Sequence, residues 1–458
     1  SPGVAYRHAV WSPEGDRIAW FNDQEGEYGL VVADQYGEDQ RRIRIPDPTF
    51  FFVPTWAPDG SRLAFTDTDY RVLIMDVESG ELTHVDTDRF AHPERSMNPV
   101  WSPDSRWITY ARRLDNQLRA IFVHDTRSGE THQVTDGSYD AISPVWDASG
   151  KYLYFLGSTD YGLNTGWLDM TSYDRPVTRA LYVALLQEGE PSPFLPVSDE
   201  ESVEEGEEGE GGAGSEAEAR GRGSAEESVP DVIIDLQGIS GRIVDAPGLP
   251  VRNYLGLVEG PEGRVFVAEA VPNQRGAVLH RYSVEDAEAQ EFVTGMLTAT
   301  ASHNRKHLLL RSSGGWSVAG TGGAPPRDGG ESLNTSGMRI RVEPRAEYAQ
   351  MLRDGWRFMR DFLYVDNTHG APWDEVWEWY SPWLEDVNHR SDFNHLLDIL
   401  SGEIAVGHSY VRGGDYPDLD NPRTGLLGAD LREEEGSYRI HRIYETDEWT
   451  VGLESPLA

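Results

Sequence analysis

The sequence predicts a mainly β protein organised as a β-propeller, with a small helical subdomain after it. Tryptophan recurs at intervals of 45 residues, and each copy opens a similar tight-turn phrase. Short apolar strands follow every turn at similar spacing, and units of about 45 residues with four short strands are typical of propeller blades. Before residue 344 apolar side chains recur every second residue, as in strands. From residue 344 they recur every three or four residues, which predicts helices.

The repeat is set by Trp11, Trp56, Trp101 and Trp146. Phrases such as Trp-Ala-Pro-Asp-Gly favour a tight turn, because Pro presets φ at the first central position and Gly suits the close. We therefore expect each phrase to join two strands. Seven and nine residues after each tryptophan lie apolar pairs that would share one strand face, namely Ile18/Trp20, Leu63/Phe65, Ile108/Tyr110 and Leu153/Phe155.

Degenerate copies at residues 260–267 and 301–310 extend the repeat, so six blades are anchored by turns within residues 1–342. A seventh blade is expected either to be split between the ends, with residues 4–9 and 338–342 as candidate strands, or to lie upstream. Between the fourth and fifth anchors, residues 198–229 are mostly Glu, Gly, Ser and Ala without any aromatic residue. Such a tract buries too little apolar surface to fold, which predicts a disordered acidic insertion.

Residues 343–424 are expected to form a helical subdomain. The first helix is predicted over residues 348–363, where apolar side chains recur at steps of three and four. A second helix is expected over residues 374–387, bent near Pro382, and a third is expected to begin at a Ser391 cap.

Composition excludes several classes of function. Lys and Arg number 40 against 78 Asp and Glu, and the net charge of −38 argues against binding to nucleic acids or anionic membrane surfaces. The absence of cysteine excludes disulfides and thiolate sites. No apolar run is long enough to cross a bilayer, so we expect a soluble globular protein. No P-loop, HExxH or GxSxG phrase occurs, and no cofactor is predicted.

His408 is the candidate catalytic residue. It lies between Gly407 and Ser409, small neighbours that leave its ring reachable from outside, as a general base requires. Without its surrounding phrase, a turn histidine with no chemistry would be the preferred interpretation. Asp415 follows two glycines and could bind a substrate amine, although a solvated turn carboxylate is favoured.

A histidine pair elsewhere in the chain does not predict a metal site. His303 and His307 have helical spacing, but they fall where the repeat predicts a turn and the start of a strand. That backbone does not bring the two rings together. We therefore predict no metal ligands.

Several phrases resemble the tricorn protease family. They are residues 357–364, His369-Gly370 with Trp373, residues 407–415, and, for the entry into a PDZ-like domain, residues 425–430 and 438–457. The resemblance covers essentially the whole chain. It implies a seven-bladed propeller over residues 1–342, a first catalytic subdomain over 343–424 and the beginning of a PDZ-like domain over 425–458.

The resemblance also implies a serine peptidase that cleaves short peptides, with His408 as general base and the propeller as a substrate filter. In that family the nucleophilic serine, the oxyanion hole and an orienting Glu lie in a second catalytic subdomain, so this chain is expected to be inactive without a missing C-terminal half. Homo-oligomers and a cytoplasmic location are implied, with the periplasm as the alternative location. Family members carry a Ser that orients the histidine ring where this sequence has Gly407.

Two other interpretations remain open from the sequence. TolB-like propellers contain similar Trp-Ser-Pro-Asp-Gly turns and would make this chain a non-catalytic binding or scaffold module. Prolyl-oligopeptidase-like enzymes also join a propeller to a serine hydrolase, but the helical segment of this chain lacks the alternating strands of that catalytic fold. A propeller alone does not identify a function.

Overall fold

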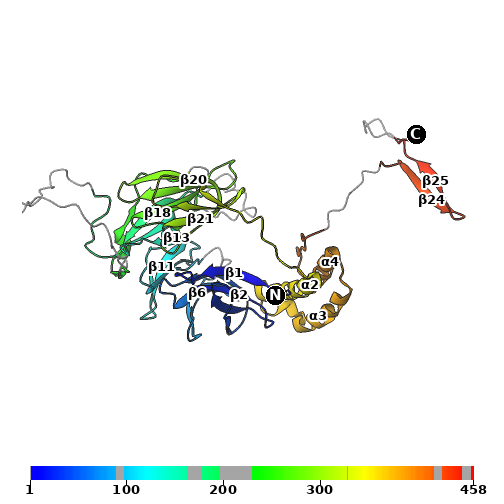
Figure 1. Ribbon diagram of the computed structural model, residues 1–458, viewed down its shortest axis with the longest axis horizontal. Coiled ribbons are helices and arrows are strands. Elements are labelled where there is room, and N and C mark those ends of the chain that lie inside the picture. Colours follow the sequence, from blue (N-terminus) through cyan, green and yellow to red (C-terminus); the bar gives the residue numbers. More distant parts are fainter. Residues whose placement is uncertain are drawn as a thin grey trace, which may run out of the picture.

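The computed structural model describes residues 2–88, 97–161, 177–195, 229–326, 329–416, 425–445 and 455–457. Strands dominate as far as residue 333, and helices occupy most of residues 344–402 (Figure 1). Every sheet is antiparallel, and strands that are neighbours in a sheet are also neighbours in sequence. This meander order confirms the predicted propeller-type fold.

The first four sheets each contain four strands and correspond to the four tryptophan repeats. The first sheet contains β1 (Tyr6–Trp11), β2 (Arg17–Asn22), β3 (Gly29–Asp34) and β4 (Arg41–Ile43). The second contains β5 (Phe51–Trp56), β6 (Arg62–Asp67), β7 (Arg71–Asp76) and β8 (Leu82–Thr87). The third contains β9 (Val100–Trp101), β10 (Trp107–Arg113), β11 (Arg119–Asp125) and β12 (Thr131–Gln133). The fourth contains β13 (Asp140–Trp146), β14 (Tyr152–Ser158), β15 (Ala180–Leu185) and β16 (Ile243–Asp245), with a 3₁₀ helix, η3 (Ile239–Arg242), before β16.

The fifth and sixth blades share one strand. Their seven-stranded sheet contains β17 (Tyr254–Glu259), β18 (Arg264–Ala270), β19 (Ala277–Ser283), β20 (Glu288–Ala301), β21 (His307–Ser312), β22 (Gly315–Gly320) and β23 (Glu331–Leu333). The first part of β20 pairs with β19 and the last part with β21. The six blades expected from the turn anchors are therefore present, although the chain passes from the fifth to the sixth without a break.

Tryptophan side chains connect successive blades. The indole Nε1 of Trp101 donates to the Thr55 carbonyl at 3.0 Å, and that of Trp146 donates to the Val100 carbonyl at 3.1 Å. Trp56 makes the equivalent, longer contact with the carbonyl of Val10 at 3.4 Å. Each bond runs back to the residue immediately before the preceding tryptophan, so the 45-residue period is also the period of the contact between blades.

The core is divided into clusters that lie between adjacent blades. In the cluster between the first and second blades, the Phe21 ring lies 5.2 Å from that of Phe51 and 5.3 Å from that of Phe65. Equivalent clusters fill the next four junctions. Trp11 has no preceding blade among the described residues and is 57% exposed, whereas Trp101 is 3% exposed.

The two segments expected to build a split seventh blade do not do so in the described structure. Residues 4–9 contribute to β1 of the first blade, and residues 338–342 form no strand. The predicted acidic insertion at residues 198–229 lies almost entirely outside the described residues.

The helical segment follows the predicted order with two corrections. It contains α2 (Pro344–Phe362), η5 (Thr368–Gly370), α3 (Trp373–Tyr380), η6 (Ser381–Asp386) and α4 (Arg390–Gly402). The second predicted helix is not one bent helix: α3 ends before Pro382, which lacks an N–H, and the chain continues as a 3₁₀ helix. The predicted Ser391 cap is wrong, because His389 caps α4 and accepts the Ser391 N–H.

Two strands near the C-terminus, β24 (Ala429–Glu434) and β25 (Ser437–Ile443), pair as a hairpin. Almost every residue in it is exposed. The hairpin falls within residues 425–458, for which the start of a PDZ-like domain stays a prediction. Within the described part of the chain, no helix is both long and apolar enough to span a bilayer.

The blade contacts predict unequal effects of one substitution at two equivalent repeat positions. Trp101→Phe removes a buried indole N–H donor and should lower the free energy of unfolding by about 1–3 kcal/mol. Trp11→Phe, at the exposed equivalent, should change it by less than about 0.5 kcal/mol. Urea denaturation of both variants measures the difference, and equal losses would contradict this account of the repeat.

Candidate functional site

His408 lies on an irregular loop six residues after the end of α4. Leu400 and Ile404, which precede His408, are buried in the core of the helical segment, whereas the His408 side chain is exposed. The backbone of His408 is in the left-handed region, with φ of 70°. Its Nδ1 lies 3.0 Å from the Tyr410 hydroxyl. The imidazole is therefore accessible from outside the helical subdomain, with one ring nitrogen already paired.

The far end of the loop is fixed to the beginning of α4. Asn394 Nδ2 donates to the Gly413 carbonyl at 3.0 Å and also lies 3.0 Å from the Tyr416 hydroxyl. Gly414 has φ of 110°, and a Cβ there would lie 2.3 Å from Nε of Arg390. A side chain at position 414 would be strained by both the backbone angle and the contact, so glycine is needed where the loop turns.

The helices behind the loop share one hydrophobic core. Trp356 Nε1 donates to the Trp373 carbonyl at 2.7 Å, and Trp373 Nε1 donates to the Trp356 carbonyl at 2.9 Å. This reciprocal pair joins α2 to α3, and the Tyr348 ring stacks on Phe393 of α4. Both indole N–H groups are satisfied while the rings remain buried.

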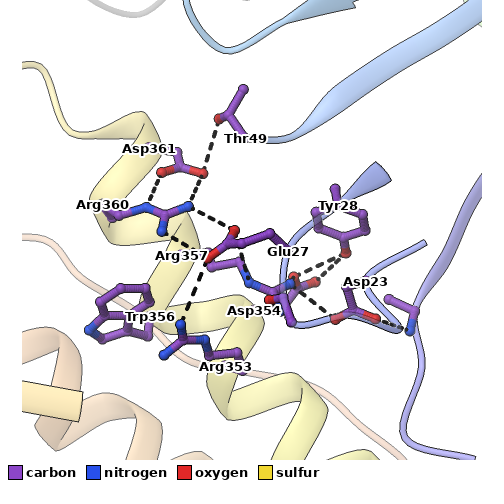
Figure 2. A network of polar contacts seen from close by, with 12 residues as sticks. Asp23, Glu27, Tyr28, Thr49, Arg353, Asp354, Trp356, Arg357, Arg360 and Asp361 are labelled. Atoms are coloured by element: carbon purple, nitrogen blue, oxygen red, sulfur yellow. Dashed lines mark hydrogen bonds and ion pairs between the residues drawn. The ribbon is translucent and has the colours of Figure 1, made fainter. Parts of the chain in front are cut away.

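Arg357 attaches α2 to the first blade (Figure 2). Its side chain is only 2% exposed, and Nη1 lies 3.0 Å from Asp23 Oδ2 and 3.1 Å from Asp354 Oδ1. Nη2 donates to the Gly26 carbonyl at 2.6 Å. Asp23 and Gly26 belong to the loop between β2 and β3, so one buried guanidinium joins elements that are more than 300 residues apart.

A second arginine adds a more exposed contact at the same junction. Arg360 forms a bidentate pair with Glu27, in which both N–O distances are 3.1 Å. Arg360 also pairs with Asp361, whose other oxygen accepts the Thr49 hydroxyl at 3.0 Å. The two parallel hydrogen bonds fix the orientation of α2 as well as its position, because the planar guanidinium and the carboxylate match in geometry.

Asp354 carries the main electrostatic cost of this junction. Burial raises its pKa above the ordinary value, although Arg357 and the Tyr28 hydroxyl act in the opposite direction. Tyr28 donates to Asp354 at 3.0 Å, and burial together with the Asp354 charge raises the pKa of Tyr28. The junction thus holds a carboxylate in a place that disfavours its charged form.

The other candidate residues do not join His408. His303 lies in a turn and His307 begins β21, and both side chains are exposed. Asp415 is exposed near the end of the loop. Among the described residues, no group of three or more His, Asp or Glu side chains is placed to hold a metal ion. A cavity of about 530 Å³ is lined by residues of β20–β23 and their connections, and by none from the helical subdomain.

Sequence reasoning missed the side chains that contact His408 and its loop. Tyr410 lies only two residues after the histidine, so its proximity was a usable signal. Asn394 falls on the polar side of a predicted helix and gave no such signal. The Asp23–Arg357 pair was not visible either, because nothing local relates a loop in the first blade to a helix 334 residues later.

The buried junction predicts a large effect of Arg357→Met. The substitution leaves the buried Asp23 and the half-buried Asp354 without their shared cation, so the free energy of unfolding should fall by about 3–5 kcal/mol. Arg345→Met, at an exposed position of the same helix, should lower it by less than about 1 kcal/mol. Denaturant unfolding compares them, and a small effect of Arg357→Met would refute the importance of the junction.

Asp354 also predicts a pH dependence. Because its folded-state pKa is raised, its contribution to stability is full below the unfolded value near 3.8 and is lost as pH rises through the folded-state pKa. The stability of the wild type relative to Asp354→Asn should therefore fall as pH rises from about 4 toward neutrality. Urea titrations of both proteins across this range measure the trend, and a rising difference would contradict it.

Comparison with known families gives a match for the propeller and a match for the helical segment. Residues 1–322 match the family model described as the tricorn protease second beta propeller domain. Residues 344–402 match the tricorn protease C1 domain. The first match ends at residue 322, in the last blade, and the second begins at residue 344, where α2 begins.

The chain is 28% identical over 487 residues to tricorn protease homolog 1 of Streptomyces coelicolor, covering 100% of this chain and 43% of that protein. It is 24% identical over 448 residues to the tricorn protease of Thermoplasma volcanium, covering 95% and 40%. The chain thus spans less than half the length of these relatives.

A crystal structure of the tricorn protease has the same fold, with a TM-score of 0.71 and 18% identity over 99% of this chain and 42% of that one. The family model for the propeller alone covers well over half of the sequence. The chain therefore belongs to the tricorn protease family.

Proposed function

We propose that this chain forms the propeller and the histidine-bearing subdomain of a serine peptidase that cleaves short peptides. His408 is the general base, and the serine nucleophile is supplied by a second catalytic subdomain beyond this chain. The observation that carries the proposal is the exposed His408 ring on a loop fixed at both ends to α4. An exposed but positioned imidazole can meet a catalytic group brought by another subdomain.

The proposed chemistry uses the free ring nitrogen. When Nδ1–H of His408 donates to the Tyr410 oxygen, Nε2 is left to accept the proton of the serine hydroxyl as the serine oxygen attacks the peptide carbonyl. The imidazolium then returns that proton to the leaving amine. The described part of this chain provides a base for this reaction, so residues 1–458 are expected to be inactive when separated from the serine.

The remaining parts of the proposal concern access and assembly. The propeller would admit short peptides and exclude folded proteins, and residues 425–458 would begin a PDZ-like domain that leads to the second catalytic subdomain. We also propose that the protein forms homo-oligomers and acts in the cytoplasm, with the periplasm as the alternative. Support for these points comes from family membership.

The proposal predicts the effect of two histidine substitutions in the longer protein that carries the serine subdomain. His408→Ala should lower kcat by at least about a thousandfold, because the serine loses its base. His395→Ala, at an exposed position of α4, should leave kcat within about twofold. Hydrolysis of short fluorogenic peptides measures both.

The same assay separates the alternative functions. This chain by itself should show no hydrolysis, and adding the serine subdomain should produce it. Unchanged turnover in His408→Ala would instead favour the non-catalytic binding module. Hydrolysis by the 458-residue chain alone would contradict a divided site.

A further inference from the structure

The His408 ring has one identifiable partner. Among the residues that the structure describes, Tyr410 is the one side chain that hydrogen-bonds the imidazole, through Nδ1 at 3.0 Å. The two ring centroids are 6.2 Å apart and the ring planes meet at 54°, so the contact is made by the hydroxyl and not by stacking. Both residues lie on the same short loop.

The immediate neighbours of His408 offer no such contact. Gly407 has no side chain, and a Cβ at that position would meet nothing within 4 Å. The Ser409 hydroxyl is buried and makes no hydrogen bond among the described residues. An orienting group for the ring must therefore come from elsewhere on the loop or from another subdomain.

We propose that Tyr410 is the positioning residue for His408, through a hydrogen bond from Nδ1–H of the imidazole to the tyrosine oxygen. The inference rests on the proposed function of His408 as general base. A histidine that accepts a proton at Nε2 must carry its own hydrogen on Nδ1, so the proposal requires the tyrosine oxygen to accept from Nδ1–H. A tyrosine hydroxyl can also donate, and in that case Nδ1 would carry no hydrogen. The same bond limits rotation of the ring.

The loop is built to hold the tyrosine in place. The guanidinium carbon of Arg412 lies 5.0 Å from the centre of the Tyr410 ring, which braces the ring from its face. On either side the backbone is fixed, because Ile404 is buried and Gly413 is bonded to Asn394. The tyrosine oxygen is therefore held close to Nδ1 while the imidazole remains exposed.

A hydroxyl partner for the imidazole differs from a carboxylate partner because it carries no negative charge. A hydroxyl oxygen that accepts from Nδ1–H holds the tautomer and the direction of the ring, but it adds less stabilisation to the imidazolium than an ionised group does. Removing the oxygen should therefore reduce kcat by roughly ten- to hundredfold, much less than removing His408, with little effect on KM.

The first test observes the tautomer in this chain without any activity. The protein is labelled with ¹⁵N-histidine, and the His408 signals are assigned with His408→Ala. Where the His408 ring is neutral, the wild type should carry its hydrogen on Nδ1. Tyr410→Phe keeps the ring beneath Arg412 and removes only the oxygen, so the share of the Nε2–H tautomer should increase.

The matched control makes the same chemical change at another exposed tyrosine. Tyr438→Phe, in β25, should leave the His408 signals unchanged. The positioning role is overturned if Tyr410→Phe has no effect on the tautomer, or if Nδ1 of the wild type carries no hydrogen.

The second test measures peptide hydrolysis in the longer protein with the serine subdomain. If His408→Ala abolishes turnover and Tyr410→Phe lowers kcat at constant KM, both the base and its positioning residue are supported. If His408→Ala abolishes turnover but Tyr410→Phe matches the wild type, the positioning role fails and the base assignment stands. If His408→Ala has no effect, the proposed function itself fails.

Discussion

The buried contact between Arg357 and the loop joining β2 to β3 determines where the helical subdomain lies. Asp23, Asp354 and the Gly26 carbonyl all face one guanidinium that is 2% exposed. Burying the guanidinium with fewer partners would lower the stability of the fold. Burying these acceptors without the guanidinium would lower it too. These contacts favour one geometry, in which both Nη atoms of Arg357 are paired and Nε lies 3.7 Å from Glu27. Because α2 shares its core with α4, this geometry also sets the position of the loop that carries His408 relative to the first blade.

The propeller and the helical subdomain use different means to fix neighbouring elements. Between blades, the same tryptophan contact is repeated along the chain, and each apolar cluster fills the junction of two sheets. Such a series can tolerate a variation like the continuous β20, because each blade depends mainly on the blades beside it. The junction with α2 occurs once and is polar. Directional contacts suit that place, since charge and hydrogen bonding specify an orientation that an apolar surface alone would leave loosely defined.

The sequence was most informative where a contact repeats or acts locally. The tryptophan interval located the blades, and the small neighbours of His408 indicated an accessible ring. Local patterns failed where competing groups were present, as at α4, where His389 provides the cap in place of Ser391. They also failed at Pro382, where the chain continues as a 3₁₀ helix. The Arg357 network was beyond such reasoning, because its partners are 334 residues apart and their charges look like an ordinary solvated surface in the sequence.

The central claim is that the exposed imidazole of His408 serves a serine brought by another part of the protein. The most direct measurement is a crystal structure of the longer protein after reaction with a peptide phosphonate, a reagent that bonds covalently to an activated serine. The account predicts that Nε2 of His408 lies within about 3.2 Å of the modified serine oxygen or of the atom that replaces the leaving amine. A modified serine beside a different histidine, with His408 remote from the bound reagent, would contradict it.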